Sequence, residues 1–139
     1  MKQIVPLIDK GPSDNPRFQY TIATAYYYGK EYEKSISYGL TSAAQYSCYD
    51  TELLLSDLFL KTHDYQQCFD HASLAHRMCP NRLMPLYILF NLSSELSDFD
   101  RLKLIGDEIL HKEIKVNSED TRLIRYDVRK RMYEILYDY

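Results

Sequence analysis

Two cysteines and two histidines lie close together between Tyr65 and Asn81, where they have the residue types of a metal site. Thiolates and imidazoles are typical zinc ligands, and Cys68, His71, His76 and Cys79 supply two of each. The stretch has the pattern of one helix, in which Cys68 and Cys79 would lie roughly 16 Å apart. One zinc ion holds its ligands at about 2.0–2.3 Å. We therefore predict no metal and no cofactor; two half-sites completed by another chain are the alternative.

No arrangement of residues in the chain has the pattern of an active site. It lacks a glycine-rich phosphate loop, a nucleophile elbow and a paired-carboxylate signature. Cys68 is expected to be a small apolar core residue, because free cysteine packs like one. The sequence therefore predicts that this chain is not an enzyme.

Net charge and apolar content argue against two classes of partner, nucleic acids and the membrane interior. The net charge is −3 with both signs interspersed, which argues against a nucleic-acid interface. No apolar run approaches the roughly 20 residues of a membrane span, so we expect no membrane insertion. The start of the chain does not have the pattern of a signal peptide. Three cysteines neither require nor exclude an oxidising compartment, so the cytoplasm and the periplasm both remain open.

Apolar residues recur at three- and four-residue steps and predict helices throughout. Residues 1–16 are expected to be a leader or linker, with Pro16 in the first turn of the following helix. Residues 113–117 alternate polar and apolar side chains and are expected to be extended, and Ser118 is expected to cap the last helix. The predicted helices are 17–28, 32–46, about 50–61, 65–78, 84–96, 99–111 and 118–139.

Aromatic residues mark a repeat. Tyr32, Tyr65 and Phe99 are spaced by 33 and 34 residues, and each follows a short polar break. This spacing resembles the tetratricopeptide repeat, a pair of helices per unit. The resemblance implies an all-α fold: a right-handed α-solenoid of three helical hairpins (17–48, 50–81 and 84–115) plus a C-terminal capping helix (118–139) in a single domain. An unrelated helical bundle is the alternative.

The second repeat matches the pattern best and the third least. The family places small residues where its two helices approach closely, and here Phe90, Leu102 and Ile109 occupy such places in repeat three. We therefore expect wider packing next to the capping helix. That helix carries an apolar stripe that closes the stack, and Arg122, Arg125 and Arg129 are expected on its solvated face.

The resemblance also implies a concave groove lined by the first helix of each hairpin. A protein or peptide segment is the expected partner. The alternatives are a glycan, with Tyr20, Tyr27, Tyr28 and Tyr87 stacking on sugar rings and Asp57 and Asn91 bonding hydroxyls, and self-association through the leader or an open end. Thr24 and Asp57 stand where a carboxylate clamp would need Lys and Asn, so no clamp is expected. The groove positions are Arg17, Tyr20, Thr24, Tyr27, Tyr28, Asp50, Leu53, Asp57, Leu60, Lys61, Met84, Tyr87, Asn91, Ser94 and Glu95.

Two segments carry a narrower resemblance. Residues 79–87 read CPNRLMPLY and residues 109–118 read ILHKEIKVNS. They are similar to the C-terminal tetratricopeptide region of O-antigen ligase/polymerase-like membrane proteins of Bacteroides-type bacteria, whose chemistry lies in a membrane part. The resemblance implies a soluble accessory region of a surface-glycan assembly protein, tethered to the inner membrane in a full-length parent; a free-standing relative that acts as a scaffold is the alternative. In this turn Arg82 is expected to bond the open carbonyls that end helix 65–78.

Overall fold

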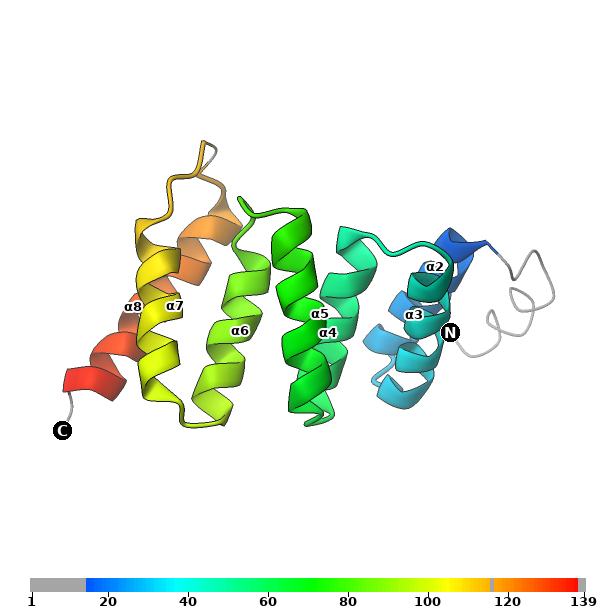
Figure 1. Cartoon of the computed structure of the whole chain (residues 1–139), viewed down its shortest axis with the longest axis horizontal. Helices are drawn as coiled ribbons and strands as arrows, with labels where there is room; N and C mark the ends of the chain where they lie inside the picture. Colours follow the sequence, from blue (N-terminus) through cyan, green and yellow to red (C-terminus); the bar gives the residue numbers. More distant parts are fainter. Residues whose placement is uncertain (1–14, 116, 138–139) are drawn as a thin grey trace.

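The computed structural model describes residues 15–115 and 117–137, and within them the chain is all-helical with no strand. Seven helices follow one another along the long axis of the molecule (Figure 1). None of them combines the length and apolarity needed to cross a bilayer. The helices are α2 (Pro16–Tyr28), α3 (Tyr32–Gln45), α4 (Tyr49–Lys61), α5 (Tyr65–Met78), α6 (Met84–Glu95), α7 (Phe99–His111) and α8 (Glu119–Tyr137).

Helices α2 to α7 form three consecutive hairpins. Helix α2 packs on α3, α4 on α5, and α6 on α7, and each hairpin also contacts the next through α3–α4 and α5–α6. The first helices of neighbouring hairpins touch as well, in the order α2–α4 and α4–α6. The last helix, α8, contacts both α6 and α7 and closes the row at the end opposite α2 (Figure 1).

The three turns inside the hairpins have the same backbone structure. Lys30, His63 and Ser97 each adopt a positive φ, of 61°, 65° and 54°. In the second turn the His63 amide donates to the Leu60 carbonyl, and the Asp64 amide donates to the Phe59 carbonyl. The other two turns repeat both bonds at equivalent positions. This is the Schellman helix ending, which normally uses glycine at its left-handed residue.

Ser97→Gly is expected to stabilise the protein. A left-handed backbone destabilises the folded state by roughly 1–2 kcal/mol when the residue has a Cβ, and glycine avoids this strain. Glycine also makes the unfolded chain more flexible, which offsets part of the gain. We expect the free energy of unfolding to rise by about 0.5–1 kcal/mol. Urea unfolding of Ser97→Gly beside Ser97→Ala tests this, because alanine keeps the Cβ and should give no gain. Equal stability of the two variants would contradict the explanation.

Most of the buried apolar side chains of the described residues belong to two clusters. One joins α4, α5 and α6 through residues such as Leu58, Cys68 and Leu92. The other joins α6, α7 and α8 around Phe90, and it contains Val128 from the inner stripe of the last helix. The last helix therefore closes the second cluster, as its apolar stripe predicted.

Two close contacts between helices depend on a glycine, because a Cβ at that position would overlap a side chain of the neighbouring helix. A Cβ at Gly39 of α3 would lie 2.8 Å from Leu55 Cδ2 of α4. A Cβ at Gly106 of α7 would lie 2.2 Å from Met132 Sδ of α8. Each glycine is the eighth residue of its helix. The large Phe90, Leu102 and Ile109 of the third hairpin are fully buried, while Gly106 provides the space that α8 needs.

The observed helix ends lie within one or two residues of the predicted ends. Pro16 lies in the first turn of α2 and the Asn15 side chain caps it. Ser118 Oγ accepts from the Thr121 amide, as expected of a cap. Helix α4 begins at Tyr49, one residue before its predicted start, and its cap residue Cys48 makes no side-chain cap bond. Residues 112–115 have no regular secondary structure; residues 1–14 and 116 lie outside the described part.

Two arginines have roles other than those expected. Arg125 was expected on a solvated face, but its guanidinium donates to the carbonyls of Ile109 and Lys112 and so caps the end of α7. Arg82 was expected to bond carbonyls at the end of α5. Its guanidinium instead lies 5.0 Å from the centre of the Tyr49 ring, and only its backbone amide bonds a carbonyl there, that of Cys79.

Candidate binding surface

The residues predicted to line a groove all lie at the surface of the three first helices. None of them is buried, whereas residues on the opposite side of the same helices, such as Ile22, Leu55 and Ile88, are buried. The exposed ones are Arg17, Tyr28, Asp50, Lys61, Met84 and Glu95. The half-buried ones are Tyr20, Thr24, Tyr27, Leu53, Asp57, Leu60, Tyr87, Asn91 and Ser94.

Contacts join groove positions of the first and second hairpins. The Tyr27 hydroxyl of α2 donates to Asp57 Oδ2 of α4 over 2.5 Å. Lys61 Nζ lies 3.5 Å from the same oxygen, and it also lies 5.7 Å from the centre of the Tyr27 ring. Burial, then the hydrogen bond and the charge of Asp57, raise the pKa of Tyr27 above its ordinary value of 10.0. Tyr27 therefore remains a hydrogen-bond donor and links α2 to α4.

The third hairpin is joined to α8 by a similar set of side chains. The Tyr87 hydroxyl of α6 donates to Asp127 Oδ2 over 2.5 Å, and Arg131 Nη1 donates to the same oxygen over 3.1 Å. Arg131 also donates to the Asn91 side-chain oxygen. Both sets contain a tyrosine, an aspartate two helices further along the chain, and a cation four residues after that aspartate. They fix the spacing of the helices that carry the surface.

One end of the surface is hollowed. A pocket of about 340 Å³ opens between α2, the end of α3 and the start of α4. Three of the predicted groove residues line it, namely Arg17, Tyr20 and Asp50. Burial is the main cause that raises the pKa of Tyr20, and the nearby Asp50 carboxylate adds to it. Thr21, Tyr46, Cys48 and Thr51 complete most of the wall.

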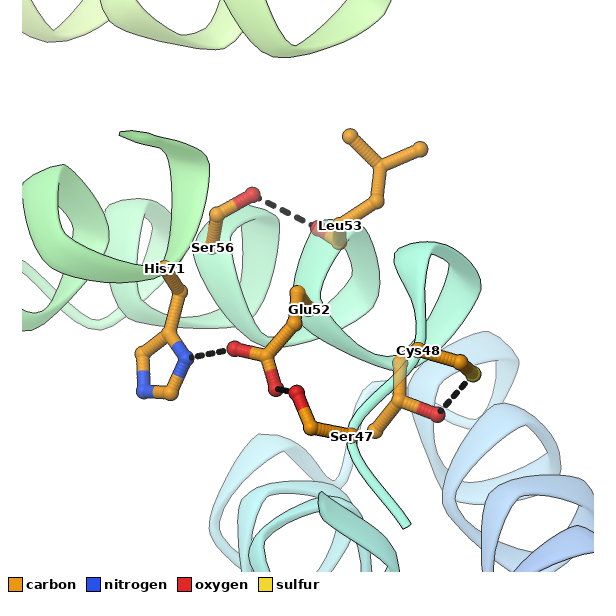
Figure 2. A network of polar contacts seen from close by, with 7 residues as sticks. Ser47, Cys48, Glu52, Leu53, Ser56 and His71 are labelled. Carbon is orange, nitrogen blue, oxygen red and sulfur yellow. Dashed lines mark hydrogen bonds and ion pairs between the residues drawn. The ribbon is translucent and has the colours of Figure 1, made fainter. Parts of the chain in front are cut away.

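A buried polar network lies beside this pocket, and its pairing was not foreseen from the sequence. Glu52 of α4 is 2% exposed. Its Oε1 lies 2.6 Å from His71 Nδ1 of α5, and its Oε2 accepts from the Ser47 hydroxyl over 2.9 Å (Figure 2). The His71 ring also stacks on Phe59, with ring centres 5.4 Å apart. The network ties the connector before α4 to both helices of the second hairpin.

The order of these groups determines what they can do chemically. Ser47 and His71 contact different oxygens of one carboxylate (Figure 2). The serine hydroxyl therefore donates to Glu52, and the His71 imidazole is not placed to accept the proton of that hydroxyl. An activated serine needs its base on the hydroxyl. The geometry therefore fits a structural link between elements, with all the buried oxygens of Glu52 satisfied.

The protein is expected to lose stability in acid through Glu52. Burial alone would raise its pKa, but hydrogen bonds from His71 and Ser47 and the charge of His71 outweigh it and lower the pKa below 4.5. A lowered pKa stabilises the folded state at pH values above 4.5, and this contribution is lost as the pH falls below that value. Thermal unfolding from pH 7 to 3 tests this. In Glu52→Gln the loss below pH 4.5 should be smaller than in the wild type; an identical loss would contradict the role of Glu52.

The residues that resembled a metal site point to different parts of the fold. Cys68 is fully buried in the first cluster, as predicted, and burial raises its thiol pKa to about 12. His71 binds Glu52, while His76 Nε2 lies 3.8 Å from Glu108 of α7. Cys79 follows the end of α5. Among the described residues no group of histidine, cysteine and acidic side chains converges on one point.

Comparison of the chain with protein-family profiles, curated proteins and solved structures found no match.

Proposed function

We propose that this chain is a tetratricopeptide-like α-solenoid that binds an extended protein or peptide segment along the first helices of its hairpins. The observation that carries the proposal is the pairing of predicted groove positions on neighbouring helices, Tyr27 with Asp57. Side chains that meet in this way belong to one continuous surface. The three identical turns, 33 and 34 residues apart, support the repeat interpretation.

The pocket beside Tyr20 is the best anchor for such a segment. It combines tyrosine surface with the charges of Arg17 and Asp50, and rigid aromatic area with a few polar groups is typical of peptide-binding sites. The glycan alternative has less support. The two groups expected to bond sugar hydroxyls, Asp57 and Asn91, already accept bonds from Tyr27 and Arg131.

A displayed peptide library tests the groove. Peptides selected on the wild-type chain should bind about tenfold more weakly to Tyr28→Ala or Asp50→Ala, since a small number of contacts carry most binding energy. Both side chains are exposed, so folding should be unaffected. Leu104→Ala is the matched control, because Leu104 is 72% exposed on the second helix of its hairpin. Equal loss in the control, or no loss in the groove variants, would count against the proposal.

The link to surface-glycan assembly is a further proposal that depends only on the two resembling segments, residues 79–87 and 109–118. Its test is the reading frame upstream of the Met1 codon in the source genome. An open frame encoding several membrane spans would support an accessory region of a membrane glycan enzyme. A stop codon directly upstream would favour a free-standing scaffold and remove this proposal, while leaving the groove proposal intact.

A further inference from the structure

The outer side of α8 is a second unusual surface. Its inner stripe is buried, as Val128 and Met132 show, but Leu123, Tyr126 and Tyr133 on the other side are 58%, 64% and 65% exposed. Tyr126 and Tyr133 are seven residues apart, two helical turns, and so lie on one face. A hollow of about 340 Å³ opens between them, lined also by Arg129, Lys130 and Glu134. Large apolar area of this kind marks contact surfaces.

Helix α8 stands where a fourth hairpin would place its first helix. Met132 of α8 fits against Gly106 of the preceding α7, just as Leu55 of α4 fits against Gly39 of the preceding α3. The two glycines have the same place in their helices. Asp127 precedes Met132 by five residues and binds Tyr87 of α6. Asp50 precedes Leu55 by five residues and adds to the rise of the pKa of Tyr20 in α2. The two helices can therefore be compared residue by residue.

This comparison identifies which face of α8 is open. Arg129 of α8 corresponds to Glu52 of α4, and Tyr133 corresponds to Ser56. Glu52 and Ser56 are buried, and Glu52 contacts His71 of the hairpin's second helix, α5. Arg129 and Tyr133 are exposed instead, and within the described residues no helix follows α8. Among the described residues, no helix covers the face of α8 that corresponds to the face of α4 covered by α5.

We propose that this outer face of α8 docks an amphipathic helix of a partner protein, which carries a carboxylate where α5 carries His71. The reversed charge supports this choice: a glutamate faces the covering helix in α4, and an arginine with a neighbouring lysine faces outward in α8. A second copy of this chain fits less well. Pairing two α8 helices about the midpoint of Tyr126 and Tyr133 brings Arg129 and Lys130 of both copies together, in either orientation.

Two peptides that differ in one side chain test the proposal on the full chain. Both contain residues 65–78, the α5 segment, with His71→Glu in one and His71→Lys in the other. Titration to about 1 mM peptide, followed by NMR of backbone amides, should shift resonances around Tyr126 and Arg129. The glutamate peptide should bind about tenfold more tightly than the lysine peptide. The paired variant Arg129→Glu with Lys130→Glu should reverse that preference.

The groove variant Asp50→Ala is the matched control and should leave both titrations unchanged, because this surface is separate from the groove. The proposal fails if neither peptide shifts α8 resonances, or if the double charge reversal leaves the preference unaltered. Light scattering that detects a dimer of the wild type, lost in Tyr126→Ala, would assign the face to a second copy and also overturn it.

Discussion

Glu52→Ala is expected to lower the free energy of unfolding by about 3 kcal/mol at pH 7, because it removes a buried acceptor that two neighbouring side chains share. The carboxylate is 2% exposed and contacts both His71 and Ser47. Without it, His71 and the Ser47 hydroxyl lose their bonds, and the space that Glu52 filled remains as a cavity. The midpoint of thermal unfolding should fall by roughly 10 °C.

A double-mutant cycle separates the energy of the polar contacts of Glu52 from the effect of the cavity that its removal leaves. Glu52→Gln keeps the shape and is expected to cost about 1–2 kcal/mol, whereas Glu52→Leu with His71→Leu removes both polar partners and should be far less harmful than either single change. Urea unfolding at pH 7 measures all of these variants. Additive single and double effects, or a loss below about 0.5 kcal/mol in Glu52→Ala, would show that the network contributes little.

Much of the fold could be predicted because its signals are local. Helix ends follow from breaks such as Gly29 and Pro80, and from polar caps such as Asp64, which accepts from the Gln67 amide. The spacing of the aromatic residues predicted the length of each hairpin, because each of these residues begins the second helix of a hairpin. The same register placed the predicted groove residues at the surface. Helix ends and surface positions depend on residues no more than a few positions apart, and the spacing of the aromatic residues can be read directly along the chain.

The pairings between helices could not be predicted, because each depends on side-chain direction across elements far apart in the chain. Arg125 has the spacing of a solvated stripe, yet the approach of α8 to the end of α7 gives it carbonyls to cap. Glu52 has the pattern of an exposed first-turn residue of a helix. Only the position of α5 brings His71 to it and makes it a buried acceptor. The Tyr27–Asp57 bond spans 30 residues, and nothing local indicates it.

Phe90→Ala is expected to have the largest effect of any single change described, a loss of about 3–5 kcal/mol. Phe90 is fully buried and lies in the cluster where α6, α7 and α8 meet. The guanidinium of Arg131 lies 4.9 Å from the centre of its ring, so truncation also removes a contact that holds α8 in place. Domains of this size are stable by only about 5–15 kcal/mol, so this loss is a large fraction of the whole.

The position of Phe90 makes the result informative about α8. If α8 closes the stack, Phe90→Ala should release α8 before the second hairpin opens, because the cluster around Leu58, which joins α4, α5 and α6, does not include Phe90. Hydrogen exchange of Phe90→Ala should then be accelerated more in α8 and α7 than in α4 and α5. Leu104→Ala is the control, and its free energy of unfolding should change by less than about 0.5 kcal/mol. Uniform acceleration across all helices would indicate instead that the two clusters unfold as one unit and that α8 has no separate role as a cap.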